Sequence, residues 1–291
     1  MELNELWTLH ERRLTDASKL LTPPSEANGM ARAFAVLILA GILACDRPGE
    51  LDVLHDGDWV DLSHDFSDQT IYWPTAKPFE LEVVSAQQTD AGYYYAANNF
   101  SAAEHGGTHL DAPIHFAEGR WTTDQIPIQR LVGQAVVVDV QAGADSSADY
   151  RVDNTAIAGW ERKHGAIPSG SIVLFRTGWA RRWPDRAAYL GTSRAGAAAV
   201  ANLHFPGIDS ATAQWLVNRN VKAVGIDTPS IDYGQSTSFP THRVLFAANI
   251  PAFENVANLD RLPPRGSFVI ALPMKIKGGS GGPLRIVALV P

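Results

Sequence analysis

Residues able to bind a metal ion are concentrated in one short segment, which holds His105, His109, Asp111 and His115 within eleven positions. Imidazole nitrogens combined with a carboxylate oxygen form a ligand set that suits zinc, manganese or iron. His109 and Asp111 are two residues apart, so in an extended segment their side chains point to the same side. We therefore expect His105, His109 and Asp111 to bind one divalent ion.

The residues between these side chains argue against a regular helix. Gly106-Gly107 weakens a helix and Pro113 interrupts one. The two glycines allow the backbone to fold close to an ion and to bring His105 beside His109. A lone histidine is usually structural or solvated, but a cluster this dense with two glycines inside it favours a metal site. His115 remains as an imidazole with no obligatory ligand role, which is what a general base requires.

The same segment carries a family resemblance. Residues 105–115 read HGGTHLDAPIH and resemble the H-x-G-T-H-x-D-x-P-x-H signature of the cyclase family, which includes bacterial kynurenine formamidases and isatin hydrolases. The resemblance runs from about Trp59 to the C-terminus. It implies a single α/β domain with a mixed, barrel-like fold of β/β/α layers, and it implies a homodimer or homotetramer.

The resemblance also implies the ligands of two metal positions. His105, His109 and Asp111 correspond to the ligands of the first ion. His242 and Glu254 are twelve residues apart, the spacing at which kynurenine formamidases supply a histidine and a glutamate to a second ion. Isatin hydrolases lack that carboxylate and hold one manganese. The implied cofactor is therefore one or two ions of zinc or manganese per chain.

The implied reaction is hydrolysis of an amide-type C–N bond by metal-activated water. His115 is expected to transfer the proton, and His64 is the next candidate if it does not. Trp73 matches the tryptophan that formamidases of this family place against the substrate. The favoured substrate is an arylformamide of the N-formylkynurenine type. The alternatives are a ring-opening cyclic amidase of the isatin hydrolase type and a non-catalytic lipoprotein that binds a metal or another ligand.

Composition excludes several other classes of protein. The chain has 291 residues, of which 45% are hydrophobic and 19% charged, enough for one large domain with a substantial core. A net charge of -7 and a pI near 5.7 argue against a nucleic-acid surface. The sequence has no phosphate loop and no dinucleotide-binding turn. Its single cysteine, Cys45, excludes an intrachain disulfide and a thiolate metal cluster.

The N-terminal region predicts export. Arg32 precedes an apolar run over residues 33–44, and small Ala44 lies directly before Cys45, an order that resembles a bacterial lipoprotein signal. We predict translation from Met30 and a lipid anchor at Cys45, in the periplasm or on the cell surface, and a cytoplasmic protein otherwise. The alternative for this run is a buried N-terminal helix. The predicted organisation is an upstream extension (1–29), a signal peptide (30–45), a linker (46–58) and a hydrolase domain (59–291).

Periodicity predicts more strands than helices. The runs 134–140 and 171–177 are apolar and β-branched, as is typical of strands buried on both faces. Helices are expected over 153–164, between an Asp153 cap and Gly165, and over 209–218. The remaining predicted strands are 59–64, 79–86, 93–100, 221–226, 268–272 and 285–290.

Several segments allow more than one interpretation. Asp227 and Asp232 are interpreted as structural hydrogen-bonding residues. The glycine loop 277–283 is interpreted as a cover for the active site, a donor of backbone N–H groups to an oxyanion, or a surface turn. Residues 142–150 are expected to be a polar loop. The arginine- and tryptophan-rich segment 179–189 is expected to be an exposed loop or an oligomer contact.

Overall fold

A closed sheet forms the centre of the computed structural model, which describes residues 57–290. Eight strands pair in the order β1-β12-β11-β5-β7-β9-β10-β4, and a further pairing of β12 with β4 closes seven of them into a barrel. Strands β5, β7, β9 and β10 pair in parallel, and the other pairings are antiparallel. The bounds are β1 Asp58–Asp61, β4 His109–Asp111, β5 Val132–Asp139, β7 Ile172–Arg176, β9 Ala223–Ile226, β10 Ala252–Glu254, β11 Arg265–Pro273 and β12 Gly281–Val290.

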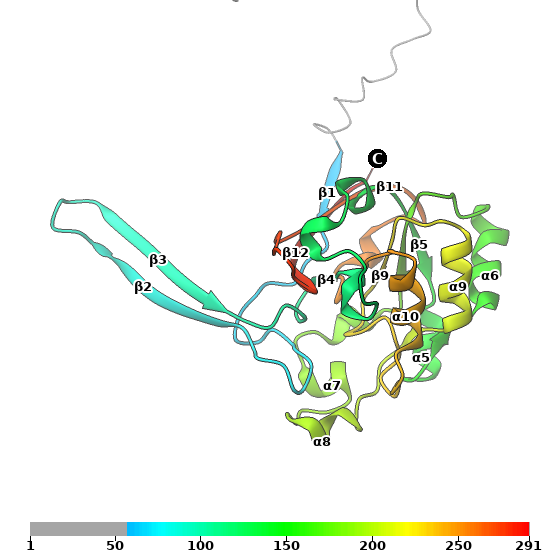
Figure 1. The fold of residues 1–291 in the computed structure, drawn as a ribbon, viewed down its shortest axis with the longest axis horizontal. Helices are drawn as coiled ribbons and strands as arrows, with labels where there is room; N and C mark the ends of the chain where they lie inside the picture. Colours follow the sequence, from blue (N-terminus) through cyan, green and yellow to red (C-terminus); the bar gives the residue numbers. More distant parts are fainter. Residues whose placement is uncertain (1–56, 291) are drawn as a thin grey trace, which may run out of the picture. The chain divides into compact units, whose positions relative to one another are not determined.

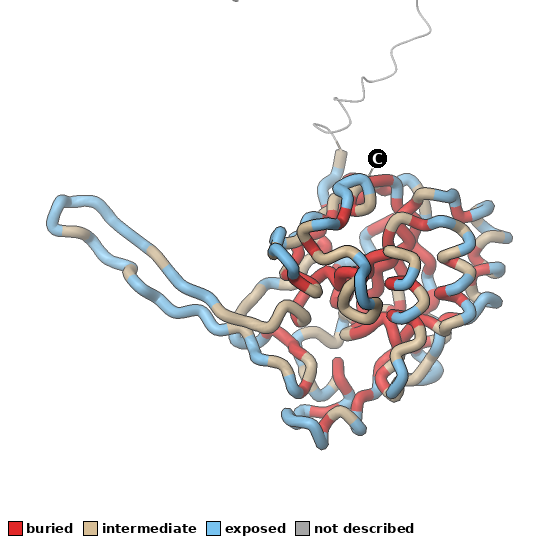
Figure 2. Tube along the Cα trace, in the orientation of Figure 1, coloured by how far each residue is buried: buried red, intermediate tan, exposed pale blue. Residues whose placement is uncertain are grey.

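Three helices cover one face of the parallel strands: α6 (Asn154–His164), α9 (Ser210–Asn218) and α10 (Pro240–Ala247). Figure 1 shows them on one side of β5 and β9. Alternate residues of β5 point to opposite faces of the sheet and pack in two separate hydrophobic cores. Val136 and Val138 pack in the core beneath the helices, whereas Ala135 and Val137 pack inside the barrel. This burial on both faces explains the continuous apolar run of the sequence. In Figure 2 the buried segments of the body of the molecule are red.

Short elements complete the described part of the chain. Two small sheets pair β2 (Glu80–Gln88) with β3 (Tyr94–Ser101) and β6 (Arg151–Val152) with β8 (Gly207–Ile208). The remaining helical segments are η2 Pro113–His115, η3 Thr123–Gln125, α4 Ile128–Leu131, α5 Gln141–Ser146, η4 Trp179–Arg182, α7 Arg186–Leu190, α8 Ala197–Val200 and η5 Leu259–Arg261. None of the helices between residues 57 and 290 combines the length and the apolar character that a membrane span requires.

The helix ends predicted from sequence are confirmed. The Asp153 side chain accepts a hydrogen bond from the backbone N–H of Ala156 at the start of α6, and Gly165 ends that helix at φ 81°. The Asp209 side chain likewise accepts from Ala211 at the start of α9. The predicted α/β class and barrel-like single domain are also confirmed.

Two sequence-based expectations are wrong. Part of the polar segment 142–150 lies in helix α5. Within 179–189, Trp179 and Tyr189 are fully buried in a small cluster, so the segment is not simply an exposed loop; the oligomer contact expected as its alternative stays a prediction. The predicted extension, signal peptide and linker fall almost entirely outside the described residues.

Candidate metal centre

Strand β4 places His109 and Asp111 on one side of the barrel wall. It is only three residues long, and both flanking strands hold it: β10 on one edge and β12 on the other. In the register with β10, Glu254 lies directly opposite His109, so their side chains start out close together. His109, Asp111 and Glu254 are almost completely buried, with at most 4% of each residue exposed.

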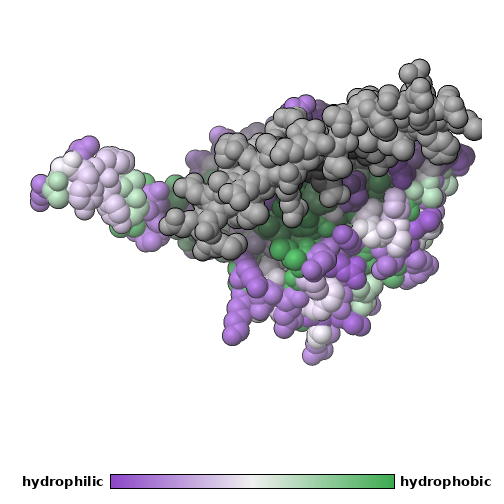
Figure 3. Space-filling model, turned by 90° about the horizontal axis from the view of Figure 1, so that it is seen from above, coloured by the Kyte–Doolittle hydropathy of each residue, from purple (hydrophilic) through white to green (hydrophobic). Residues whose placement is uncertain are grey.

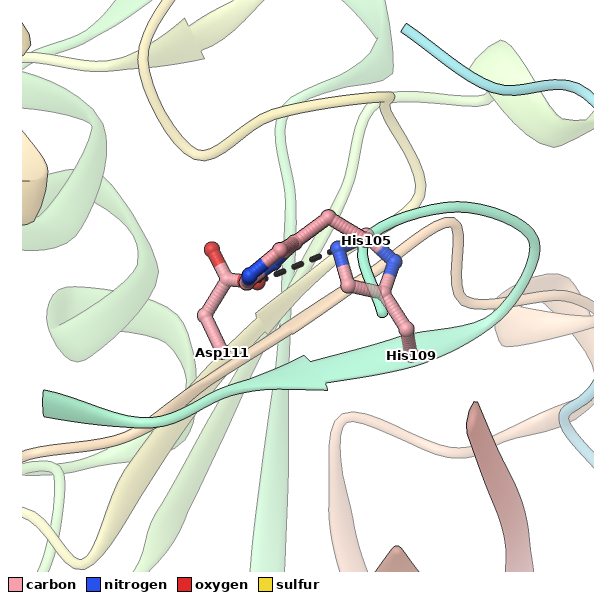
Figure 4. A group of neighbouring side chains, drawn as sticks. All are labelled: His105, His109 and Asp111. Carbon is pink, nitrogen blue, oxygen red and sulfur yellow. Dashed lines mark hydrogen bonds and ion pairs between the residues drawn. The ribbon is translucent and has the colours of Figure 1, made fainter. Parts of the chain in front are cut away.

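Glycines bring His105 to the same place, as the sequence predicted. Gly107 has a left-handed φ of 57°, which lets the chain reverse between His105 and β4. A Cβ at Gly106 would overlap the ring of Tyr72. Figure 4 shows the side chains of His105, His109 and Asp111 converging.

The first group of ligand atoms surrounds one oxygen of Asp111. Its Oδ1 lies 2.6 Å from His105 Nδ1 and 3.1 Å from His109 Nε2. The ligand atoms of these three residues all lie within 4.8 Å of one another. The structure thus brings together the three residues predicted to hold the first ion.

A second group uses the other oxygen of Asp111. Its Oδ2 lies 3.2 Å from Nε2 of His242, and that nitrogen lies 3.3 Å from Oε1 of Glu254. Helix α10 supplies His242 and strand β10 supplies Glu254. Asp111 therefore belongs to both groups of ligand atoms.

Each histidine of the cluster has its other ring nitrogen engaged outside it. His242 Nδ1 donates to Asp232 Oδ2 at 2.6 Å, and His109 Nδ1 donates to the carbonyl oxygen of Gly107 at 2.9 Å. Such partners fix the tautomer of a ligating imidazole and its orientation. For His109 and His242, this leaves Nε2 facing the cluster, where its lone pair would be available to a bound metal ion.

In His105 it is Nε2, and not Nδ1, that bonds outside the cluster, and its partner is Ser280 of the glycine loop. Its Nε2 donates to Oγ of Ser280 at 2.9 Å, and that hydroxyl donates to Glu104 Oε2 at 2.7 Å. Nδ1 of His105 therefore faces Asp111. Gly281 leaves room for this ring, since a Cβ there would lie 2.6 Å from His105 Cε1. The loop supports the cluster from behind, so neither a plain surface turn nor a cover over the site describes it.

The buried carboxylates of the cluster favour a positive charge beside them. Burial disfavours a charged His109, but Asp111 and Glu254 outweigh it and raise its pKa to about 9. Burial, reinforced by the charge of Asp111, raises the pKa of Glu254. Protons on imidazoles balance these carboxylates when no metal ion is bound, and a divalent ion would replace them.

Nε2 of His109 gives independent support for a bound metal ion. Nε2 of His109 is buried and has no hydrogen-bond partner among the described residues, because its close contact with Asp111 lacks hydrogen-bond geometry. A buried polar atom left unpaired costs free energy, and coordination of a cation would remove that cost. The donor set of three imidazoles and two carboxylates suits a divalent transition metal.

His115 lies beside the cluster without belonging to either group of ligands. Its ring stacks on His105, with centroids 3.8 Å apart and planes inclined by 18°. Burial is the main cause that lowers its pKa to about 4; the charge of Asp111 opposes this shift, and His105, His109 and His242 add to it. His115 is therefore neutral at pH 7 and able to accept a proton.

A cavity of about 300 Å³ opens onto these polar groups. The rest of its lining is largely apolar and aromatic, and includes Ile71, Tyr72, Trp73, Phe116 and Phe239. The Trp73 ring packs edge-on against Phe205 and near Phe239. Trp73 thus lies where the sequence expected a substrate-facing tryptophan. His64 does not line this cavity and stacks on Trp183 instead.

Sequence reasoning missed several residues that build the site. Ser280 and Glu104 carry no sequence signal of a role at the site, although they hold His105. Phe239 has a left-handed φ of 46° at the start of α10, a strained conformation of the kind that clusters at functional sites. The structural role predicted for Asp232 extends to the cluster, because its side chain accepts a hydrogen bond from the ring of His242.

Comparison with known proteins agrees with this geometry. The family model described as "Putative cyclase" matches residues 60–233. The isatin hydrolase of Roseibium aggregatum is 34% identical over 220 residues, which cover 73% of this chain and 81% of the relative. The kynurenine formamidase of Salinibacter ruber is 30% identical over 232 residues, which cover 78% of this chain and 95% of the relative.

A solved structure extends the match to the whole fold. Isatin hydrolase A from Ralstonia solanacearum superposes with a TM-score of 0.74 at 33% identity, over 93% of this chain and all of that one. The chain belongs to the cyclase family and is a hydrolase of that family. The resemblance inferred from residues 105–115 is confirmed.

Proposed function

We propose that this protein is a metal-dependent hydrolase that cleaves an amide-type C–N bond in an arylformamide of the N-formylkynurenine type. The position of Glu254 is the observation that supports this substrate class. It lies within 3.3 Å of His242 and 3.5 Å of His109, where it completes a second group of ligand atoms around Asp111. Isatin hydrolases, by the resemblance, lack that carboxylate.

Two metal positions follow from the same geometry. His105, His109 and Asp111 would hold one ion, and Asp111, His242 and Glu254 would hold the other. We propose zinc or manganese, with one or two ions per chain. A divalent ion at this site would polarise a carbonyl oxygen and lower the pKa of bound water from about 15.7 to about 7.

His115 is proposed to carry the proton in both halves of the reaction. Neutral at pH 7, it can take a proton from the attacking water as the new C–O bond forms. It then returns that proton to the leaving nitrogen as the C–N bond breaks, so the products are a carboxylic acid and an amine. The aromatic wall that includes Trp73 would bind the aryl ring of the substrate.

A ring-opening cyclic amidase of the isatin hydrolase type is the second candidate. Overall similarity favours it, because the isatin hydrolase of Roseibium aggregatum is 34% identical to this chain and the kynurenine formamidase of Salinibacter ruber 30%. The non-catalytic alternative is not retained, since the chain is a hydrolase of this family.

A substrate comparison on metal-loaded protein tests the proposal. Initial rates on a formanilide series, simple lactams and isatin would be measured with zinc and with manganese, each with a chelator control. We expect the largest kcat/KM on an ortho-substituted formanilide and loss of activity on chelation. A larger kcat/KM on isatin would favour the second candidate, and no hydrolysis of any amide would reject both.

Export and oligomeric state complete the proposal. Lipid anchoring at Cys45 would be tested by the intact mass of the native protein, since a mature chain that retains residues 1–44 would contradict it. The homodimer or homotetramer implied by the resemblance stays a prediction at this point.

A further inference from the structure

Tyr72 is a buried tyrosine that lines the cavity of the metal centre. Only 3% of the residue is exposed, and its hydroxyl has no hydrogen-bond partner among the described residues. A buried polar group without a partner costs free energy, and most such groups in folded proteins are paired. A polar group of a bound ligand would supply the partner that this hydroxyl lacks.

Three other tyrosines close to it in the chain have different surroundings. The hairpin of β2 and β3, which follows Tyr72 in the chain, projects from the barrel with nearly all of its length exposed (Figures 1 and 2) and with hydrophobic residues along it (Figure 3). Tyr93, Tyr94 and Tyr95 belong to this hairpin and are between 51% and 60% exposed, so water can bond their hydroxyls. Of these four tyrosines, only Tyr72 needs a partner from the protein or from a ligand.

The backbone around Tyr72 is bonded on both sides. Tyr72 forms an isolated antiparallel bridge with Gly106, and the N–H of Gly107 donates to the carbonyl oxygen of Ile71 at 3.0 Å. The guanidinium of Arg186 donates to the carbonyl oxygen of Tyr72 at 3.1 Å. The ring lies directly against Gly106, since a Cβ there would be 2.0 Å from Cδ1 of Tyr72. The ring is therefore held in one place beside the metal-binding segment.

Tyr72 lies at the border between the polar and the apolar parts of the cavity. Gly106, against which its ring packs, follows the ligand His105 and also lines the cavity. Ile71 and Trp73, its neighbours in the chain, belong to the apolar lining. An arylformamide with its carbonyl group at the metal ligands and its ring on the apolar lining would therefore bring the ring position next to the amide, the ortho position, towards Tyr72.

The other hydroxyl and amide side chains that line the cavity already have partners. The Asn255 side chain donates to the carbonyl oxygen of Gly107 at 2.6 Å, and Oγ of Ser230 accepts from the N–H of Asp232 at 3.3 Å. Burial raises the pKa of Tyr72 to about 12, so its hydroxyl keeps its proton at neutral pH and can donate it in a hydrogen bond. A carbonyl oxygen of the ligand would be a suitable acceptor.

The geometry points to Tyr72 as the residue that determines specificity for a carbonyl group ortho to the amide nitrogen on the aryl ring of the substrate. Its hydroxyl donates a hydrogen bond to that carbonyl oxygen, which removes the cost of the unpaired group. A formanilide without the ortho carbonyl leaves the hydroxyl unpaired, and a site built for such a bond rejects it. This inference deepens the proposed function and rests on it for the arylformamide.

Two isomeric substrates test this role, because 2-acetylformanilide and 4-acetylformanilide carry the same acyl group at different positions. Initial rates would be measured with the metal-loaded full-length wild type, Tyr72→Phe and Tyr150→Phe. We expect Tyr72→Phe to lower kcat/KM on the 2-acetyl isomer about 5- to 100-fold, as for the loss of one hydrogen bond, and to leave kcat/KM on the 4-acetyl isomer within about twofold.

Tyr150→Phe is the matched control, because the Tyr150 ring also packs against a glycine, Gly143, but lines a separate groove beside α5 and α6. It should change neither rate. Without substrate, Tyr72→Phe should be at least as stable as the wild type in thermal unfolding, since it loses an unpaired buried hydroxyl. A loss of stability would show that the hydroxyl has a partner in the protein and would overturn the proposal.

Binding of the amine products makes the test independent of turnover. Calorimetry on metal-loaded protein would compare 2-aminoacetophenone with 4-aminoacetophenone, and Tyr72→Phe should weaken binding of the first alone. Equal losses on both isomers, or no loss on the 2-substituted compounds, would overturn the role of Tyr72. Hydrolysis of neither formanilide by the wild type would reject the proposed function, and the binding comparison would still decide the role of Tyr72.

Discussion

Each histidine ring of the cluster is oriented by its own hydrogen-bond partner outside the cluster. His109 and His242 each donate Nδ1–H to an oxygen outside it, whereas His105 donates Nε2–H to Ser280. With a metal ion bound, each of the three rings would direct the lone pair of its remaining nitrogen towards that ion. A set of histidines whose tautomers are set by different partners is prepared for a cation before one arrives, which reduces the cost of ordering the ligands on binding.

His115 allows the proton-transfer role to be separated from metal binding. His115→Ala should retain the metal and the fold, because no ligand group includes this residue. It should lose the contribution of a general acid/base, typically about 10²–10⁴-fold in rate. Metal stoichiometry and turnover, measured on the same preparation, decide the matter. Loss of metal together with activity would make His115 a ligand, and retention of both would assign the proton to another residue.

His64 should make the fold sensitive to acid. Burial lowers its pKa to about 4 against the nearby charge of Asp65, and its Nε2 has no hydrogen-bond partner in the described chain. Because the folded pKa lies below the unfolded value of about 6.5, only the unfolded state gains a proton as the pH falls from about 6.5 towards about 4. Stability is therefore lost across that window.

This prediction is tested by a substitution that keeps an aromatic ring at position 64 but removes the group that takes up the proton. His64→Phe can still stack on Trp183, and it should remove about 2 kcal/mol of the stability lost between pH 7 and pH 5. Urea unfolding of chelator-treated protein measures this without a contribution from metal release. At pH 8 the histidine is neutral in both states, so the difference there isolates packing. An unchanged pH dependence would contradict the assignment.

The sequence predicted the residues of the cluster, but not the residues that orient them through hydrogen bonds. His105, His109, Asp111 and His115 lie within eleven residues, so their spacing alone suggested a site. Ser280 is 175 residues from His105, and a serine in a glycine loop has no sequence signal for such a contact.

At the scale of elements, two very short strands determine the geometry. Strands β4 and β10 have three residues each, too few for a periodic pattern, so neither could be predicted from periodicity. Their register nevertheless places Glu254 opposite His109. The longer elements behaved differently, because β5 and α6 contain enough residues for period and capping signals to be recognised.

Asp232 couples helix α10 to the cluster. Its Oδ1 accepts from the N–H of Thr241 at 3.0 Å, and its Oδ2 accepts from the N–H of His242 at 3.1 Å and from the ring of His242. In Asp232→Asn the amide would face these donors with N–H groups, and the His242 ring would turn its own N–H towards the cluster. We expect affinity for the ion next to His242 to fall about 10–100-fold.

Asp209→Asn is the control, because Asp209 also caps a helix but lies at α9, and asparagine caps equally well. Competition with a chromophoric chelator measures the affinity of each variant. If Asp232→Asn binds metal as tightly as Asp209→Asn, Asp232 is a structural cap and does not position His242.

At the scale of the whole molecule, closure of the barrel assembles the site. The pairing of β12 with β4 brings the end of the chain against the histidine segment, so that Gly281 lies opposite Asp111. This closure rests on pairings between distant segments, which periodicity could not predict and which the family resemblance implied. The exposure of the hairpin could not be predicted either, because its alternating pattern is equally that of a strand half-buried in its own chain.

Metal binding should stabilise the molecule as a whole, since the ligands come together only in the folded state. We expect one to two equivalents of zinc or manganese per chain purified without chelator. A free ion at about 1,000 times its dissociation constant adds about 4.1 kcal/mol to the free energy of unfolding, and chelation should remove this gain. Elemental analysis and thermal unfolding measure the two quantities. No bound transition metal, together with no metal-dependent gain in stability, would contradict the proposed centre.

Glu254→Gln separates the two metal positions in the same experiment. The glutamine oxygen can still accept from the N–H of Ile231, which Glu254 Oε1 does at 2.8 Å, so the fold should be retained. Its amide would then present N–H groups where Glu254 Oε2 lies 3.5 Å from Nε2 of His109. We expect a lower metal content and a smaller thermal shift on metal addition, while His105, His109 and Asp111 still bind one ion. Two ions and full activity in this variant would show that Glu254 is not a ligand.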